Sequence, residues 1–133
     1  MGKISSKMSV GEVIPRIQGL QGLADRHLPV RVAYRLGKII KALSEEAKSY
    51  DEQRLKLAHQ YCEKDEAGNP VTKDGVFQFS LENRAAFEKE HTELLTTEIT
   101  VEATAIILDD FKDIEVSARE LLLLGDFLVE EQE

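Results

Sequence analysis

The feature that most constrains the fold is an amphipathic stretch at residues 30–64, which contains no proline and a single glycine, Gly37. Its apolar side chains recur at steps of three and four residues, which places them on one face of an α-helix. This face comprises Ala33, Leu36, Ile40, Leu43, Ala47, Tyr50, Leu57 and Tyr61, with Arg54 as its polar break. A lone helix of this length cannot bury its apolar face, so we expect flanking segments or a second copy of the chain to cover it.

Length and composition are typical of one folded domain. The 133 residues, of which 42% are hydrophobic, allow a modest core. No run approaches the ~20 apolar residues of a membrane span, and no charged and apolar leader with a cleavage site is recognisable. The single cysteine, Cys62, excludes a disulfide within the chain and fits a reduced, cytosolic setting.

Charge is distributed unevenly along the chain. Residues 1–43 carry eight Lys or Arg and two acidic residues, whereas residues 44–133 carry nine Lys or Arg and twenty-three acidic residues. The net charge of −8 therefore combines a basic N-terminal third with a strongly acidic remainder. This division indicates attraction within or between chains, or two surfaces for two partners, unless the charges simply face solvent.

The segments before the long helix are expected to form a strand and a shorter helix. Residues 3–8 could form an edge strand, and Ser9 with Glu12 matches a capping box at the start of a helix. Apolar residues then recur at helical spacing up to about His27. Pro15 implies that this helix either kinks there or begins there.

The residues after the long helix change from helical to strand periodicity. The turn formers at 65–70 predict that the long helix ends near residue 64. Asp74-Gly75 predicts a hairpin within 70–79, and Ser80 is the expected cap of a helix over about 81–96. The alternation at 98–102 predicts a strand that joins the 70–79 segment in a small antiparallel sheet.

The C-terminal residues complete the expected architecture. Residues 114–116 are a possible short strand, and Ser117 with Glu120 predicts a capped helix that ends at Gly125. The sequence therefore predicts a single domain, 1–133, of the α+β class and mainly helical. Two N-terminal helices occupy 1–64. A small antiparallel sheet, a mid-chain helix and a short C-terminal helix occupy 65–133.

Catalytic and metal chemistry find weak support. His27, His59 and His91 lie far apart, and the common nucleophile, zinc-protease, Walker and dinucleotide-binding motifs are absent from the sequence. His59 and Cys62 could share a helix face, but a structural zinc site takes four clustered N or S ligands. We therefore predict no enzymatic activity, no metal and no cofactor, and we expect Cys62 to be a small buried apolar residue.

The first three turns of the long helix carry a row of cations. We call Arg31, Arg35, Lys38 and Lys41, which follow steps of four, three and three residues, the basic face. Such a row could bind phosphates. However, the acidic remainder of the chain would repel nucleic acid. The prediction is therefore a contact with acidic residues, either of this chain or of a protein partner.

The C-terminal half of the long helix is the predicted interface with another chain. The shorter helix before it, about 15 residues and about 22 Å, covers less than half of a 35-residue helix of about 52 Å. The predicted core residues are Leu36, Ile40 and Leu43. The predicted interface residues are Tyr50, Arg54, Leu57 and Tyr61, which contact either another copy or the small sheet. Arg54 would need an acidic partner there, such as Glu90 or Glu93.

Four segments of the chain form a pattern that extends over most of its length. They are LPVRVAYRLGKIIKAL at 28–43, EKDEAGNPV at 63–71, FEKEHTELLTTEITV at 87–101 and IEVSAREL at 114–121. With these segments the chain resembles small proteins of tailed bacteriophages and prophages, a family of unknown function. The resemblance implies a viral gene and the cytoplasm of a bacterial host, and it transfers no active-site residues.

The leading functional prediction is a non-enzymatic bacteriophage accessory protein that acts through protein–protein contacts as a homo-oligomer. Its partner is itself, a phage protein or a host protein, and neither nucleic acid nor a membrane is expected. Two alternatives remain open. One is an anti-defence or host-takeover protein that binds and inhibits a bacterial protein. The other is a nucleotide-sequestering protein that binds phosphates with the basic face.

Overall fold

The computed structural model describes residues 3–130, and the chain divides into two compact units. Unit 1 comprises residues 1–47 and 98–133, and unit 2 comprises residues 48–97. The expected division at residue 64 is therefore not the observed one. The boundary falls inside the long helix because the segment after residue 97 packs with the N-terminal residues. The predicted class, a mainly helical α+β fold, is confirmed.

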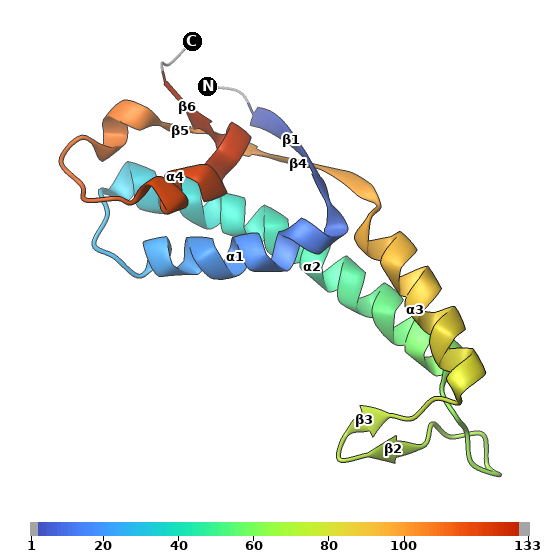
Figure 1. Cartoon of the computed structure of the whole chain (residues 1–133). Helices are drawn as coiled ribbons and strands as arrows, with labels where there is room; N and C mark the ends of the chain where they lie inside the picture. The colour runs from blue at the N-terminus through green and yellow to red at the C-terminus, as the bar shows by residue number, and fades with distance from the viewer. Residues whose placement is uncertain (1–2, 131–133) are drawn as a thin grey trace. The chain divides into compact units, whose positions relative to one another are not determined.

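The sheet of unit 1 joins the first strand of the chain to a strand almost a hundred residues later (Figure 1). Strand β1 (Lys3–Ser9) pairs antiparallel with β4 (Glu98–Thr104), with Lys3 opposite Thr104 and Ser9 opposite Glu98. The expected pairing of the 98–102 strand with residues 70–79 is therefore wrong. The register with β1 is favourable because it places the alternating apolar residues of both strands on the same, core-facing side.

Helix α1 (Val10–Ala24) follows β1 directly. The Ser9 backbone N–H donates to Glu12 Oε2 at 2.6 Å, so the predicted capping box is confirmed. The helix begins five residues before Pro15 and continues through it, so the alternative of a helix beginning at Pro15 is wrong. The face that α1 buries consists of Val13, Ile17, Leu20 and Leu23.

Helix α2 (Val30–Tyr61) is the predicted long helix and ends three residues earlier than expected. Its first half buries Val32, Leu36, Ile39 and Leu43. Leu36 and Leu43 were predicted as core, but the expected Ala33 is exposed and Ile40 is only half-buried. Adjacent apolar residues occur at 32–33 and 39–40, and packing in unit 1 buries the earlier one of each pair.

The C-terminal part of unit 1 is a set of short elements. Strand β5 (Ile106–Ile107) precedes η1 (Leu108–Phe111), and α4 (Ala118–Leu124) leads through η2 (Gly125–Phe127) to β6 (Leu128–Val129). The pairing of β5 with β6 is parallel. The capping box of α4 is confirmed, because Ser117 N–H donates to Glu120 Oε1 at 2.9 Å. The strand expected at 114–116 is wrong: this segment is irregular and starts with a turn from Phe111.

Unit 2 contains the second half of α2, a hairpin and one more helix. The hairpin pairs β2 (Thr72–Lys73) with β3 (Val76–Phe77). Asp74 and Gly75 both have positive φ, 52° and 79°, as the tightest hairpin turn requires. Helix α3 (Leu81–Leu95) is capped by Ser80, whose Oγ accepts from Asn83 N–H at 3.2 Å. The predicted hairpin and capped helix are confirmed.

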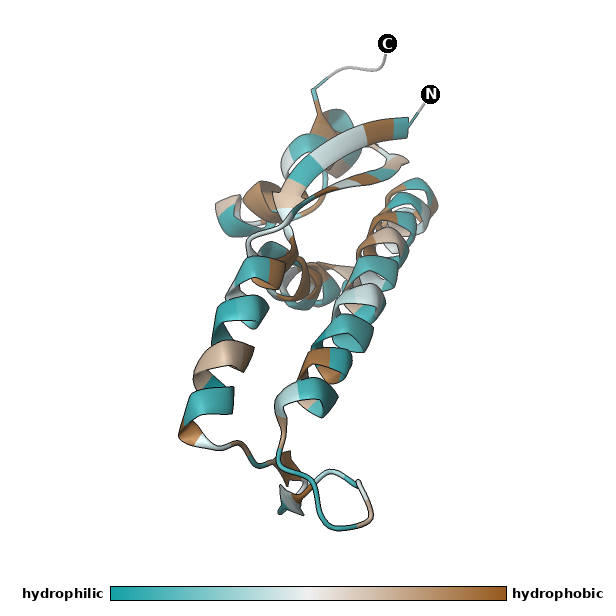
Figure 2. Cartoon of the chain, turned by 90° about the vertical axis from the view of Figure 1, so that its right-hand side faces the viewer, coloured by the Kyte–Doolittle hydropathy of each residue, from teal (hydrophilic) through white to brown (hydrophobic). Residues whose placement is uncertain are grey.

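The two units differ in how much they bury. Unit 1 contains a continuous core whose completely buried side chains include Leu20, Leu36, Ile106 and Phe127. In unit 2, only Ala58 and Cys62 are buried among the described residues, and α3 buries none of its residues. Figure 2 shows mostly hydrophilic residues along α3. Unit 2 thus lacks a core of the kind that unit 1 has.

Candidate functional site

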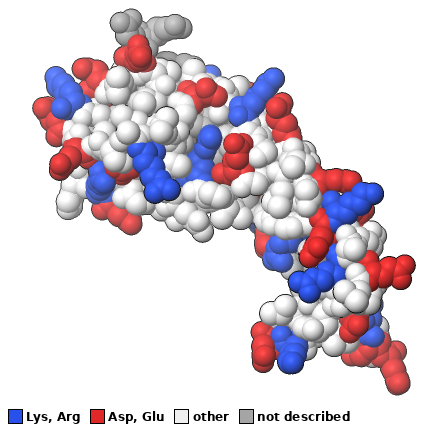
Figure 3. All heavy atoms as spheres, viewed as in Figure 1, with Lys and Arg blue, Asp and Glu red and all other residues white. Residues whose placement is uncertain are grey.

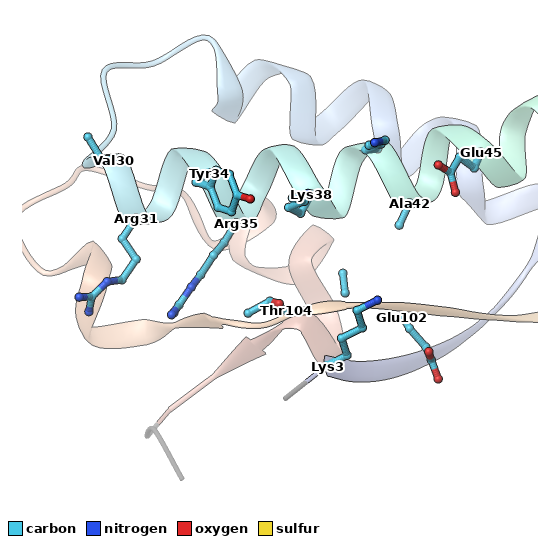
Figure 4. Close-up of a pocket in the computed structure, with 12 residues that line it drawn as sticks. Lys3, Val30, Arg31, Tyr34, Arg35, Lys38, Ala42, Glu45, Glu102 and Thr104 are labelled. Carbon is cyan, nitrogen blue, oxygen red and sulfur yellow. The ribbon is translucent and has the colours of Figure 1, made fainter. Parts of the chain in front are cut away.

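The basic face of α2 lines a hollow of about 850 Å³ in unit 1. The hollow lies between the first half of α2 and β4 (Figure 4). Its charged lining residues are Lys3, Arg31, Arg35, Lys38, Lys41, Glu45 and Glu102, and we call this hollow the basic groove. All four residues of the predicted basic face are therefore brought together at one site.

Helical spacing explains why these side chains share the groove. Arg31, Arg35, Lys38, Ala42 and Glu45 follow steps of four, three, four and three residues, which is one face of a helix. Along α2 this face extends for about 21 Å at the standard rise of 1.5 Å per residue. Figure 4 shows Arg31 and Arg35 extending from α2 toward the segment that follows Thr104, the last residue of β4.

One cation of the groove has an acidic partner. Arg35 Nη1 lies 3.9 Å from Asp110 Oδ2 in η1, which is too long for a hydrogen bond. Both atoms are buried without a hydrogen-bond partner among residues 3–130. The predicted attraction between the basic face and acidic residues of the same chain is therefore present at Arg35.

The other cations of the groove are available to a ligand. Within the described part of the chain, Lys3, Arg31, Lys38 and Lys41 form no ion pair. The Lys38 Nζ lies 5.4 Å from the centre of the Tyr34 ring, a weak cation–π contact. Figure 3 shows positive and negative side chains interspersed on the face that it presents, whereas five cations and two acids line the groove. The groove therefore attracts anionic groups.

Sequence reasoning missed the residues that the strands contribute. Lys3 and Glu102 reach the groove because β1 pairs with β4, and Ser5 Oγ donates to Glu102 Oε1 at 3.2 Å. No local pattern signals a pairing between segments almost a hundred residues apart. Tyr34 was detectable, because it lies three residues after Arg31 and four before Lys38, which is the spacing of one helix face.

The four predicted interface residues, Tyr50, Arg54, Leu57 and Tyr61, are all half-buried in unit 2. Tyr50 Oη lies 2.8 Å from His91 Nε2 of α3. Interaction with the Glu90 carboxylate is the main cause that raises the pKa of Tyr61, and burial raises it further. Polar and aromatic contacts therefore join α2 to α3 within unit 2.

Arg54 has a different acidic partner from the expected ones. Its Nη2 lies 2.8 Å from Asp51 Oδ1, one turn earlier on α2, instead of contacting Glu90 or Glu93. The pair is solvated, with 36% and 56% of the two side chains exposed, so it contributes little to stability. Asp51 neutralises the charge of Arg54, which would otherwise be unpaired on the apolar face of α2.

Aromatic stacking supports α3 in place of buried aliphatic side chains. The ring centres of Phe79 and Phe87 are 5.0 Å apart, and those of Phe87 and His91 are 5.5 Å apart. His59 meets the ring of Phe77 edge-on at 5.2 Å. Such pairs contribute about 0.5–1.5 kcal/mol each beyond burial of their area.

Among the residues considered for catalytic or metal chemistry, His59, His91 and Cys62 make contacts within unit 2. His59 and His91 face aromatic rings, and Cys62 is buried with its Sγ 3.7 Å from the carbonyl oxygen of His59. Residues 3–130 contain no group of three or more His, Cys, Asp or Glu placed to hold a metal ion. A second hollow of about 600 Å³ contains Arg26, but this cation already pairs with Glu120 at 2.9 Å.

Comparison with protein-family models, with curated proteins and with solved structures found no match. Among the helices that the structure describes, none combines the length and apolarity of a membrane span.

Proposed function

We propose that the chain is a non-enzymatic bacteriophage accessory protein that acts through protein–protein contacts as a homo-oligomer. The observation that supports this best is the small core of unit 2. In residues 48–97 only Ala58 and Cys62 are buried. Units of this size seldom hold a fixed structure without a disulfide, a metal or a partner. A second copy of the chain supplies the missing cover.

The exposed apolar surface of unit 2 supports the same proposal. Val76 and Leu81 are 61% and 91% exposed, and α3 presents half-buried Leu94 and Leu95. On α2, Leu57 is also half-buried. Burying such side chains fully contributes about 1.5–3 kcal/mol each. Self-association is the simplest way to bury them, since most soluble oligomers are symmetric assemblies of one chain.

The bacteriophage part of the proposal rests on the four segments that resemble small phage and prophage proteins. It places the protein in the cytoplasm of a bacterial host. Expression of the gene only after infection or prophage induction, followed in messenger RNA, would support this part. Constitutive expression independent of any phage functions would argue against it.

The variant Leu57→Asp tests self-association. We expect the wild type to have the mass of an oligomer in light scattering, and the variant to have a lower mass with an unchanged far-ultraviolet spectrum. Lys56→Asp is the matched control, because Lys56 is the exposed neighbour of Leu57 on α2. Leu43→Asp places a charge in the core of unit 1 and should unfold that unit. A monomeric wild type at high concentration, or unfolding of Leu57→Asp, would contradict the proposal.

A further inference from the structure

We infer that the basic groove of unit 1 binds an extended acidic segment of a partner protein, which adds as a third strand to the free edge of β4. This site lies in unit 1 and is independent of self-association through unit 2. Three features carry the inference: an unpaired strand edge, a row of unpaired cations opposite it, and a groove of the right length and charge pattern.

The first feature is the edge of β4. The sheet has two strands, and β4 pairs with β1 along its whole length, so its other edge has no strand partner among the described residues. Glu102, Ala103 and Thr104 are consecutive, and all three line the groove. Side chains of a strand alternate between two faces, so consecutive residues share a groove only where the groove follows the edge. Figure 4 shows β4 between α2 and β1.

An unpaired strand edge is a ready template for another strand. Its backbone N–H and C=O groups point outward in the plane of the sheet and accept an extended peptide through main-chain hydrogen bonds. Proteins usually block such edges with short strands, proline or charge. Here β4 has seven residues and no proline, its charged side chains are Glu98 and Glu102, and four of the five cations of the groove are on α2.

The second feature is the charge opposite this edge. Arg31, Lys38 and Lys41 have no ion pair within residues 3–130, whereas Arg35 is held by Asp110. Free cations along one wall and unpaired backbone along the other match a segment that carries carboxylates on alternate residues. The carboxylates pair with α2, and the backbone pairs with β4.

The third feature is the length and polarity of the groove. About 21 Å along α2 accommodates about six residues of extended chain at roughly 3.3 Å per residue. Arg31 and Arg35 line one end, whereas Glu45 and Glu102 line the other. The bound segment is therefore acidic where it meets the unpaired Arg31 and Lys38, and neutral or basic where it meets Glu45.

These features favour a peptide over a nucleotide. The cations are spread over successive turns of α2 instead of converging on one position, as a phosphate cradle requires. Glu45 and Glu102 would repel a ligand that is anionic throughout its length. Binding of a nucleotide is therefore the alternative that the experiment compares with binding of the peptide.

The probe is a synthetic peptide of about ten residues in which Glu alternates with Val and which ends in Lys, titrated into the full-length protein. We expect saturable binding that weakens with salt, and amides of β4 that gain protection from hydrogen exchange. Arg31→Glu with Lys38→Glu should weaken binding about tenfold or more at low salt. The matched control is Arg119→Glu, an exposed cation of α4 outside the groove, which should bind like the wild type.

Methylation of the peptide backbone distinguishes strand addition from charge attraction alone. In an added strand only alternate N–H groups point toward β4. Two peptides methylated on complementary alternate nitrogens should therefore differ in affinity by about tenfold or more. Equal affinities of the two peptides would overturn the inference. It would also be overturned by normal binding to Arg31→Glu with Lys38→Glu, or by tighter binding of ATP or of a random single-stranded DNA than of the peptide.

The variant Leu57→Asp separates this inference from the proposed function. Because Leu57 belongs to unit 2, a monomeric and folded Leu57→Asp should bind the peptide with the affinity of the wild type. Loss of peptide binding in that variant would contradict the independence of the two sites.

Discussion

At the residue scale, the two capping boxes couple stability to pH. The backbone N–H of Ser117 donates to Glu120 and is the main cause that lowers the pKa of this carboxyl below its ordinary 4.5, with a further contribution from Arg26. The backbone N–H of Ser9 likewise lowers the pKa of Glu12. A carboxyl group with a lowered folded-state pKa stabilises the fold above its unfolded pKa. That stabilisation disappears as the pH falls through the folded value.

We therefore expect the melting temperature to fall as the pH decreases from about 5 through the lowered pKa values of the two carboxyls. Glu120→Gln should melt at a lower temperature than the wild type at pH 7, and its melting temperature should fall less on acidification. Ser117→Ala should cost about 1 kcal/mol of unfolding free energy at neutral pH. Calorimetric scans across this pH range measure both effects. An equal fall of the melting temperature in Glu120→Gln and wild type would exclude the Ser117–Glu120 capping box as a source of the pH dependence.

A second residue-scale prediction concerns Asp110, which holds Arg35 at 3.9 Å. Asp110→Asn removes the one acid that pairs with a cation of the groove within residues 3–130, so the acidic peptide should bind several-fold more tightly at low salt. Asp109→Asn is the matched control, since it removes the same charge from an exposed neighbour in η1. Titrations of the two variants at equal salt concentration measure the difference. Equal affinities would mean that Asp110 does not limit the charge of the groove.

At the element scale, Gly19 and Gly22 of α1 have different surroundings. A Cβ on Gly22 would meet nothing within 4 Å, so Gly22→Ala should stabilise the protein by about 1 kcal/mol through helix propensity. A Cβ on Gly19 would clash with the side chain of Leu123 on α4. Gly19→Ala should therefore gain less than Gly22→Ala or lose stability, because Leu123 must change its rotamer.

Urea denaturation of four variants tests this difference. They are Gly22→Ala, Gly19→Ala, Leu123→Ala and the double variant Gly19→Ala with Leu123→Ala. If the clash limits the gain, the double variant will be more stable than the sum of its two single effects implies. Additive effects would show that Leu123 does not restrict residue 19.

The elements that the sequence predicts correctly are those whose causes are local. Capping boxes, the Asp74-Gly75 hairpin and the cap at Ser80 each depend on residues within four positions of one another. The partner of β4 depends on a segment almost a hundred residues away, and alternation alone does not select it. For the same reason the basic face of α2 was visible in the sequence, whereas Lys3, which reaches the groove through the β1–β4 pairing, was not.

The choice of the buried face of α2 shows a second limit. Ala33 and Ile40 fit the helical spacing as well as Val32 and Ile39 do, since the members of each pair are adjacent. Packing against the other elements of unit 1 decides between them, and the larger Val32 is buried in place of Ala33. A periodic pattern therefore predicts that a helix is amphipathic, but the direction of its apolar face is known only to within about one residue, or 100°.

At the scale of the whole molecule, the unequal cores of the two units predict unequal local stability. Unit 1 has a continuous apolar core, whereas unit 2 buries Ala58 and Cys62 alone among its residues. Regions with few buried apolar contacts open at a lower free energy and exchange their amide hydrogens faster. We expect the amides of α3 and of the β2–β3 hairpin to exchange faster than those of α1 and β4 in dilute protein.

Self-association adds a concentration dependence to this difference. If a second copy covers unit 2, raising the protein concentration increases the fraction of chains in the oligomer by mass action and so slows amide exchange in α3. Exchange in β4 should stay constant, because unit 1 carries its own core. Leu57→Asp should remove the concentration dependence of α3 and leave the exchange of β4 unchanged. Fast exchange in α3 at every concentration would mean that no second copy covers unit 2. Slow exchange in α3 even in dilute Leu57→Asp would mean that its aromatic and polar contacts suffice without a partner.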